Sequence, residues 1–181
     1  DAVIPNYFDP ADFIYSAEKK DYFLYLGRLI KRKGIEIAKE TVKAIGGKLV
    51  IAGQRRENAP CDEINTDEPY IEYVGFADWE KRRRLLSEAK ALFVPTTYIG
   101  PFEGVSIEAG FSGTPVITTP WGCFAENILD HVTGFRCATL DDFVWAAKHV
   151  DKINPKDCRD WCTKNFTIER VGLMYDHYFT Q

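Results

Sequence analysis

The sequence predicts an α/β fold, with one doubly wound parallel sheet and helices on both of its faces. Short, almost wholly apolar segments recur along the 181-residue chain, each followed by glycine or proline, with amphipathic helical patterns between them. Such apolar runs are typical of parallel strands that are covered on both faces. Glycine or proline then permits a sharp exit from the sheet.

The apolar segments predict five strands. Ligands of doubly wound sheets bind beyond the carboxyl ends of the strands, so the loops that follow them are the places to look for a site. The segments are 22–26, 48–52, 71–74, 91–94 and 115–119.

Helical patterns fill the intervals between the strands. Residues 33–45 carry apolar side chains at three-four spacing, and Asp78 is placed to cap a helix that turns Trp79, Leu85, Leu86 and Ala89 inward. Thr139 and Asp142 resemble a capping box, and Thr167 begins a last helix with Ile168, Val171, Tyr175 and Tyr178 on one side. The run 81–84, Lys-Arg-Arg-Arg, is interpreted as one helical turn of solvated charge.

Composition excludes several classes of protein. A charge of −4 and 45% hydrophobic residues exclude a disordered chain and argue against a nucleic-acid partner. No apolar run approaches the roughly 20 residues of a transmembrane helix. Five cysteines without a Cys-x-x-Cys pair favour reduced thiols in a cytosolic protein over a zinc site. The chain starts with Asp, so we expect a domain of a longer protein, with a long surface loop over 54–69.

The loop after the first strand carries four cations and precedes a helix. An arginine fork and a lysine point charge suit a diphosphate, and we assign these roles to Arg28 and Lys33. Lys31 and Arg32 are interpreted as solvated. Neither a Gly-x-Gly-x-x-Gly fingerprint nor a P-loop is present, which weakens dinucleotide and NTPase interpretations.

The loop after the fourth strand, 95–109, is the richest in candidate residues. Gly104 allows a close backbone approach, and a helix opening near Val105 offers free amides to a phosphate. Glu108, about one turn into that helix, could accept hydrogen bonds from a ribose diol. The alternative is that Glu108 only complements the helix dipole.

Taken together, these motifs resemble the carboxyl-terminal, donor-binding half of a retaining GT-B glycosyltransferase of the family 4 type. The resemblance covers essentially the whole chain and rests on the order and spacing of the motifs. It includes the opening Val-Ile-Pro-Asn, which is similar to an interdomain linker. The motifs are Phe23–Arg28, Lys33-Gly34, Glu108-Ala109, Gly113–Thr118, Gly122, Glu126 and Thr133–Phe135.

The resemblance implies a Rossmann-like domain, 1–181, that binds a nucleotide-sugar donor without a cofactor or a metal. It implies that Arg28 and Lys33 hold the diphosphate, that Glu108 takes the ribose, and that Gly75 and Phe76 pack on the base. Amides near Glu103, Gly104 and Val105 would face the phosphates or the sugar.

The resemblance also implies what surrounds this domain. A missing amino-terminal domain would bind a glycan or lipid acceptor, with 1–20 as the linker and 166–181 as the helix that crosses back. We expect a cytoplasmic protein, with any peripheral membrane contact made through the missing half, and no hexose transfer by this chain alone. The alternative is a non-catalytic nucleotide-sugar-binding or scaffold module; an epimerase or phosphorylase is disfavoured because its motifs are not found.

One departure concerns a pair of glutamates that the resemblance predicts. Gly100 stands where the first glutamate is expected, and Glu103 stands where glycine is expected. The catalytic residue is therefore unknown, with Glu103 as the candidate. We expect Glu103 to aim at the hexose and partly replace the lost carboxylate; the alternative is a solvent-facing loop glutamate.

Overall fold

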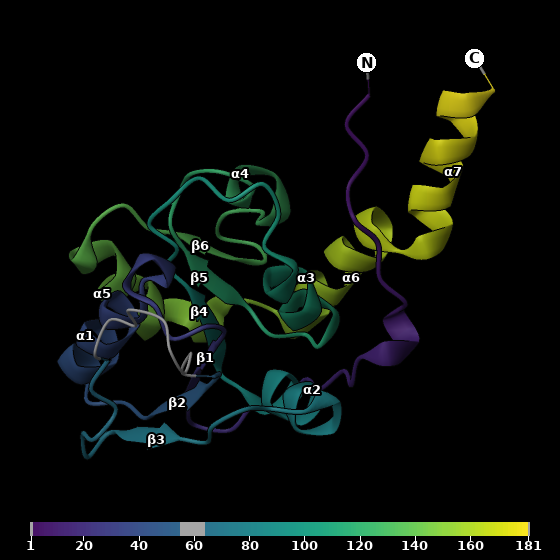
Figure 1. Ribbon diagram of the computed structural model, residues 1–181. Coiled ribbons are helices and arrows are strands. Elements are labelled where there is room, and N and C mark those ends of the chain that lie inside the picture. Colours follow the sequence, from purple (N-terminus) through teal and green to yellow (C-terminus); the bar gives the residue numbers. More distant parts are fainter. Residues whose placement is uncertain (1, 55–63, 181) are drawn as a thin grey trace.

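The computed structural model describes residues 2–54 and 64–180. Its centre is a six-stranded, wholly parallel sheet with the strand order β3-β2-β1-β4-β5-β6 (Figure 1). Five strands confirm the predicted segments, whereas β6 was not predicted, because its sequence Gly-Phe-Arg is not an apolar run. Most of the loop expected over 54–69 lies outside the described residues. The strands are β1 (Phe23–Leu26), β2 (Leu49–Ala52), β3 (Ile71–Tyr73), β4 (Ala91–Val94), β5 (Val116–Thr118) and β6 (Gly134–Arg136).

Helices cover both faces of the sheet, as predicted. Alternate residues of a strand point to opposite faces, so Phe23 and Tyr25 pack under α1 (Ile35–Ile45) and α5 (Leu140–His149). Leu24 and Leu26 belong to the opposite cluster, which α2 (Trp79–Glu88), α3 (Gly104–Phe111) and α4 (Phe124–Asn127) cover. This two-sided burial explains why the strands are apolar throughout.

A third apolar cluster joins α3 to α6 (Pro155–Phe166), a helix that was not predicted. A Cβ added to Gly110 would lie 2.3 Å from Cys162 Sγ, so α3 and α6 pack closely at this glycine. Cys158 and Cys162, four residues apart, share one face of α6, and both are buried. Burial raises the pKa of the Cys158 thiol to about 12, which makes it a poor nucleophile.

The predicted helix caps are confirmed. The Asp78 carboxylate accepts a hydrogen bond from the Lys81 amide at 2.9 Å, and Thr139 and Asp142 form a reciprocal capping box. Thr167 caps α7 (Ile168–Phe179). The inward orientation expected for Trp79 is wrong: this residue is 46% exposed, because it begins α2 at the edge of the core.

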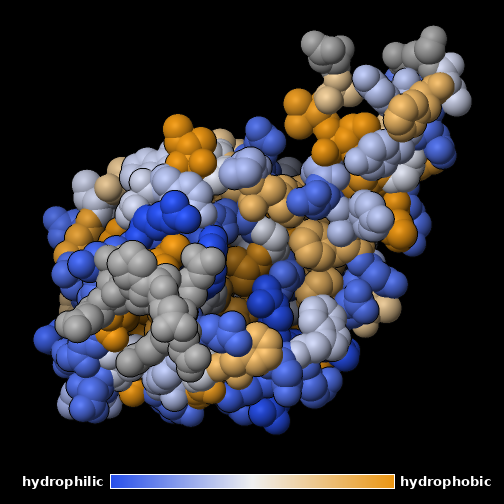
Figure 2. All heavy atoms as spheres, in the orientation of Figure 1, coloured by the Kyte–Doolittle hydropathy of each residue, from blue (hydrophilic) through white to orange (hydrophobic). Residues whose placement is uncertain are grey.

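The amino-terminal segment and α7 project together from the body of the domain (Figure 1). They are joined where the Phe8 amide donates to the Phe166 carbonyl and the Ile168 amide donates to the Phe8 carbonyl, at 2.9 and 3.2 Å. Apolar side chains gather on this projection (Figure 2), including Leu173, 63% exposed, and Phe179, 77% exposed. None of the helices in the described ranges is long and apolar enough to cross a membrane.

The two central strands, β1 and β4, mark the point where the strand order reverses. From β1 the chain builds outward through β2 and β3, and from β4 it builds outward on the other side. Gly34 lies where the loop after β1 meets the loop after β4. Its φ is +75°, and a Cβ added to it would lie 1.9 Å from the Pro95 carbonyl oxygen. Only glycine permits this approach without displacing the backbone.

We therefore predict that Gly34→Ala lowers the free energy of unfolding by roughly 2–4 kcal/mol, because it combines left-handed strain with a backbone clash. Gly172→Ala is the matched control, since a Cβ at that helical position meets nothing within 4 Å. It should leave stability unchanged or raise it by up to about 1 kcal/mol. Urea unfolding measures both; equal effects would contradict the tight approach at Gly34.

Candidate functional site

A cavity of about 240 Å³ opens at the carboxyl ends of β1 and β4, at the reversal of strand order. It brings together residues that the sequence predicted from two distant loops: Arg28, Lys33, Glu103 and Val105. Its remaining lining residues are Tyr25, Leu26, Gly27, Arg82, Phe93, Val94 and Thr96.

The loop after β1 carries the two predicted cations, Arg28 and Lys33, and a side-chain hydrogen bond holds its backbone in place. The Tyr25 hydroxyl donates to the Arg28 carbonyl at 2.9 Å, and burial raises the pKa of Tyr25, so the phenol stays a donor. Lys33 ends a 3₁₀ turn over 31–33 and is followed by Gly34. Lys31 and Arg32 are exposed, as predicted.

Lys33 and Glu103 form an ion pair across the cavity. The Lys33 ammonium donates to both carboxylate oxygens of Glu103, at 2.6 and 2.7 Å, and the Tyr98 hydroxyl donates to Oε1 at 3.3 Å. The alternative of a solvent-facing Glu103 is wrong, since this residue is only 8% exposed. The sequence did not predict its pairing with Lys33; its contact with a hexose stays a prediction.

The geometry explains why glycine at 100 accompanies glutamate at 103. A Cβ added to Gly100 would lie 3.0 Å from Glu103 Oε1 and 3.4 Å from its Cγ. The Glu103 carboxylate therefore occupies the space into which a side chain at 100 would grow. Gly122 packs against the backbone of Gly100: a Cβ added to Gly122 would lie 3.0 Å from the Gly100 carbonyl oxygen. The backbone at Gly100 therefore has little space to move away from Glu103.

Glu108 is held by Arg82, which the sequence predicted to be solvated. Arg82 Nε donates to Glu108 Oε2 at 2.6 Å, and Nη2 donates to Oε1 at 2.7 Å. The interpretation of the 81–84 run as a solvated turn is therefore wrong for Arg82, which lines the cavity, although Arg84 is exposed. A signal was present in the sequence: Arg82 lies four residues after the capping Asp78, on a helix that follows a strand exit.

The predicted base-binding residues lie apart from this cavity lining. Gly75 and Phe76 follow β3, and the Gly53 amide donates to the Gly75 carbonyl at 2.8 Å. Phe76 is 64% exposed, so its ring is available to stack on a planar group. Their role toward a base stays a prediction.

Thr96, one of the residues that line the cavity, has an unsatisfied hydroxyl. The residue is fully buried, and its Oγ1 has no hydrogen-bond partner among the residues that the structure describes. Its carbonyl oxygen, by contrast, accepts from Thr119 Oγ1 at 2.7 Å and from Trp121 Nε1 at 3.1 Å. A buried hydroxyl without a partner costs free energy that a bound oxygen would recover.

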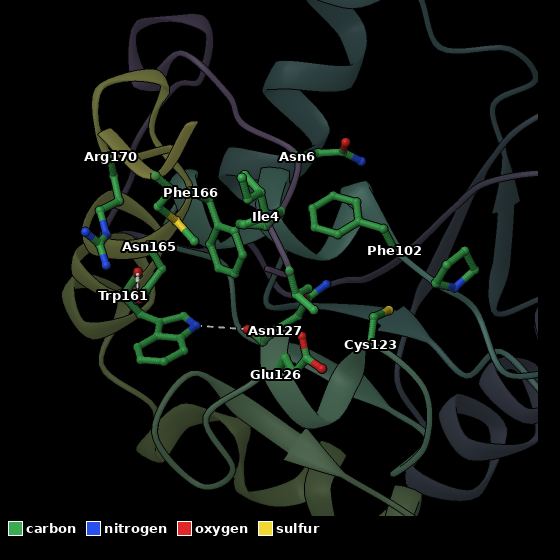
Figure 3. A pocket seen from close by; sticks show the side chains of 14 residues that line it. Ile4, Asn6, Phe102, Cys123, Glu126, Asn127, Trp161, Asn165, Phe166 and Arg170 are labelled. Carbon is green, nitrogen blue, oxygen red and sulfur yellow. Dashed lines mark hydrogen bonds between the residues drawn. The ribbon is translucent and has the colours of Figure 1, made fainter. Parts of the chain in front are cut away.

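A second cavity, of about 430 Å³, lies on the other side of the 100–103 loop (Figure 3). Phe102 and Ile4 face it, and Trp161 Nε1 donates to the Asn127 carbonyl at 2.9 Å at its edge. Its lining includes one cation, Arg170, and one carboxylate, Glu126. Besides Arg82, which is paired with Glu108, the first cavity has two cations, Arg28 and Lys33, so it suits a phosphate better.

Residues 20–152 match the family described as glycosyl transferases group 1. The chain belongs to this family. The match spans β1 to α5 and so includes every residue that lines the first cavity. Across the described parts of the chain, no group of three or more His, Cys, Asp or Glu side chains is placed to hold a metal ion.

Two named proteins to which the chain is similar are consistent with this family. A glycogen synthase of Mycobacterium tuberculosis is 30% identical over 151 residues, covering 77% of this chain and 36% of that protein. The crystal structure of AviGT4, a glycosyltransferase involved in avilamycin A biosynthesis, matches with a TM-score of 0.77 and 25% identity over 97% of this chain and 55% of that one.

A third neighbour was crystallised with a nucleotide sugar. HepE of Anabaena, in complex with UDP-glucose, matches with a TM-score of 0.80 and 15% identity over 99% of this chain and 57% of that one. At that identity the likeness shows the fold alone, a GT-B half. The chain thus spans from about a third to just over half of the length of these relatives.

The unsatisfied hydroxyl of Thr96 yields a prediction. Thr96→Val should weaken binding of pyrophosphate about threefold to tenfold, because one donor to an anionic oxygen is lost. The melting temperature of the free protein should stay unchanged or rise, since the hydroxyl has no partner to lose. Calorimetric titration and a thermal melt measure the two effects.

Thr118→Val is the control, because Thr118 is equally buried and its hydroxyl is likewise unpartnered among the described residues, but it does not line this cavity. This variant should leave pyrophosphate affinity as it is. Loss of stability without loss of affinity in Thr96→Val would show that the hydroxyl serves the fold instead.

Proposed function

We propose that this chain is the donor-binding domain of a retaining glycosyltransferase that moves a hexose from a nucleoside diphosphate to a glycan or lipid. The observation that carries the proposal is one cavity in which Arg28, Lys33 and Val105 of α3 converge at the reversal of strand order. Nucleotides bind at this point in doubly wound sheets. The UDP-glucose complex of HepE supports the proposal at the level of the fold.

The diphosphate is the group that the cavity recognises best. Arg28 supplies a planar fork and Lys33 a point charge. Within the described chain, no side chain caps the start of α3, so the amides of Gly104 and Val105 and the positive end of the helix dipole remain for an anion. These groups would stabilise the charge that develops on the diphosphate as the sugar leaves.

The ribose, the base and the hexose of the donor would extend from the bound diphosphate. Glu108 would accept from the ribose hydroxyls, and Phe76 would stack on the base. Glu103, between Lys33 and the second cavity, would meet the hexose. This arrangement assigns each predicted residue a part of the donor.

The acceptor would be held by a further domain. The projecting amino-terminal segment and α7 expose apolar side chains at the same end of the molecule, which supports docking of such a domain there (Figure 2). The 181-residue chain alone would then bind a donor without transferring its sugar.

A second candidate function is a binding module that has lost catalysis. The Lys33–Glu103 pair favours it, because this pair neutralises one of the phosphate-binding cations. A donor-hydrolysis assay on the full-length protein separates the two functions.

Selective binding of nucleoside diphosphates is the first test. At about 100 times the dissociation constant, the ligand should add roughly 2.7 kcal/mol to the stability of the chain, measurable as a thermal shift with UDP, GDP, ADP or their sugars.

Arg28→Ala should remove about 1.5–3 kcal/mol of the free energy of binding of the nucleoside diphosphate, and Lys31→Ala, outside the cavity lining, almost none. Absence of any shift at millimolar ligand would contradict the proposal, and equal losses would contradict the assignment of the loop.

Glu103→Gln tests the hexose contact separately. The variant keeps the shape of the side chain but removes the charge that occupies Lys33. We expect the nucleotide sugar to weaken about tenfold relative to the bare nucleoside diphosphate, since only the sugar form meets the carboxylate. Competition titrations measure the ratio; if both ligands change equally, Glu103 acts on the phosphates alone.

A further inference from the structure

Arg82 is a cavity residue for which the proposed function leaves no role. It comes from the second turn of α2, while its partner Glu108 comes from α3, 26 residues along the chain. The guanidinium meets the carboxylate side-on, with one N–H to each oxygen, at 2.6 and 2.7 Å. Such a bidentate pair fixes the plane of the carboxylate as well as its position.

The helix that carries Arg82 is itself anchored. Asp78 caps its start, and Lys81 Nζ donates to the Val74 carbonyl at 2.8 Å, which holds the first turn against the end of β3. Leu86 and Ser87, one turn further on, are fully or almost fully buried. Arg82 is therefore presented to Glu108 from a rigid element.

The pair leaves hydrogen-bonding capacity on its ligand side. A carboxylate oxygen has about two acceptor positions, and Arg82 uses one on each oxygen of Glu108. One acceptor position per oxygen thus remains, and because the two point away from each other, each can receive a separate hydroxyl. Glu108 Oε1 lies 4.0 Å from where a Cβ on Gly104 would stand, so the missing side chain of Gly104 leaves that approach open.

The charges are also balanced for a donor. An isolated carboxylate beside the diphosphate cavity would repel the ligand, whereas Glu108 is neutralised by a cation in direct contact. The side chains of Arg82 and Glu108 are 28% and 13% exposed, so the pair is reachable at the edge of the site without being fully solvated.

We propose that Arg82 is a positioning residue for nucleotide recognition: it fixes the Glu108 carboxylate so that one of its free acceptor positions receives the 2′-hydroxyl of a ribose. The inference rests on the proposed function. It makes Arg82 responsible for the preference of the site for ribonucleotides over deoxyribonucleotides.

The test compares each nucleoside diphosphate that the 181-residue chain binds with its 2′-deoxy counterpart, by calorimetry. The quantity measured is the deoxy-to-ribo ratio of dissociation constants. Arg82→Gln should lower this ratio at least about fivefold while the affinity for the deoxynucleotide stays within about twofold. Arg82→Lys, which keeps the charge but loses the fork, should give an intermediate ratio, and it serves as the second variant if Arg82→Gln folds poorly.

The matched control is Arg84→Gln, an exposed arginine on the same helix, which should leave the ratio unchanged. An unchanged ratio in both Arg82 variants overturns the inference while the proposed function stands. Equal weakening of the ribo and deoxy ligands also overturns it, because Arg82 would then contact phosphate or merely tie α2 to α3. A wild-type chain that binds no nucleoside diphosphate overturns the proposed function, and this inference with it.

Discussion

The parallel pairing of β1 with β4 is the constraint on which the rest of the structure depends. These strands are separated by two complete strand–connection units, yet Phe23 pairs with Ala91 and Tyr25 with Phe93. Because both strands end at the same edge, the loop with Arg28 and Lys33 and the loop with Glu103 meet there. The close approach of Gly34 to Pro95 fixes the distance between them. A single register thus sets the charge distribution of the cavity.

The cavity is nearly self-neutralised before any ligand enters. Lys33 is paired with Glu103, and Arg82 is paired with Glu108, each cation and its partner coming from different elements. Pairing limits the desolvation cost of burying these groups in the free protein. An anionic ligand in this cavity would therefore compete with Glu103 for Lys33.

The fold was largely predictable because its signals are local. Apolar strands, glycine exits and the caps at Asp78, Thr139 and Thr167 are all read within a few residues of one another. β6 was not predicted because Gly-Phe-Arg is not an apolar run. α6 was not predicted because it is polar outside the face that bears Cys158 and Cys162. Within the site, the order of motifs indicated Arg28, Lys33, Glu103 and Glu108. The partners of those residues could not be predicted, since Lys33 and Glu103 are 70 residues apart and only tertiary packing makes them neighbours.

Phe8 connects the two ends of the domain to the loop of the cavity. Its backbone bridges to Phe166 and Ile168, where the amino-terminal segment and α7 leave the body together. Its ring stacks on Phe102 with a centroid distance of 6.3 Å, and its Cζ lies 3.3 Å from where a Cβ on Gly104 would stand. A rotation of the projecting segments would therefore move the Phe8 ring against Phe102 and against Gly104, the first residue of α3.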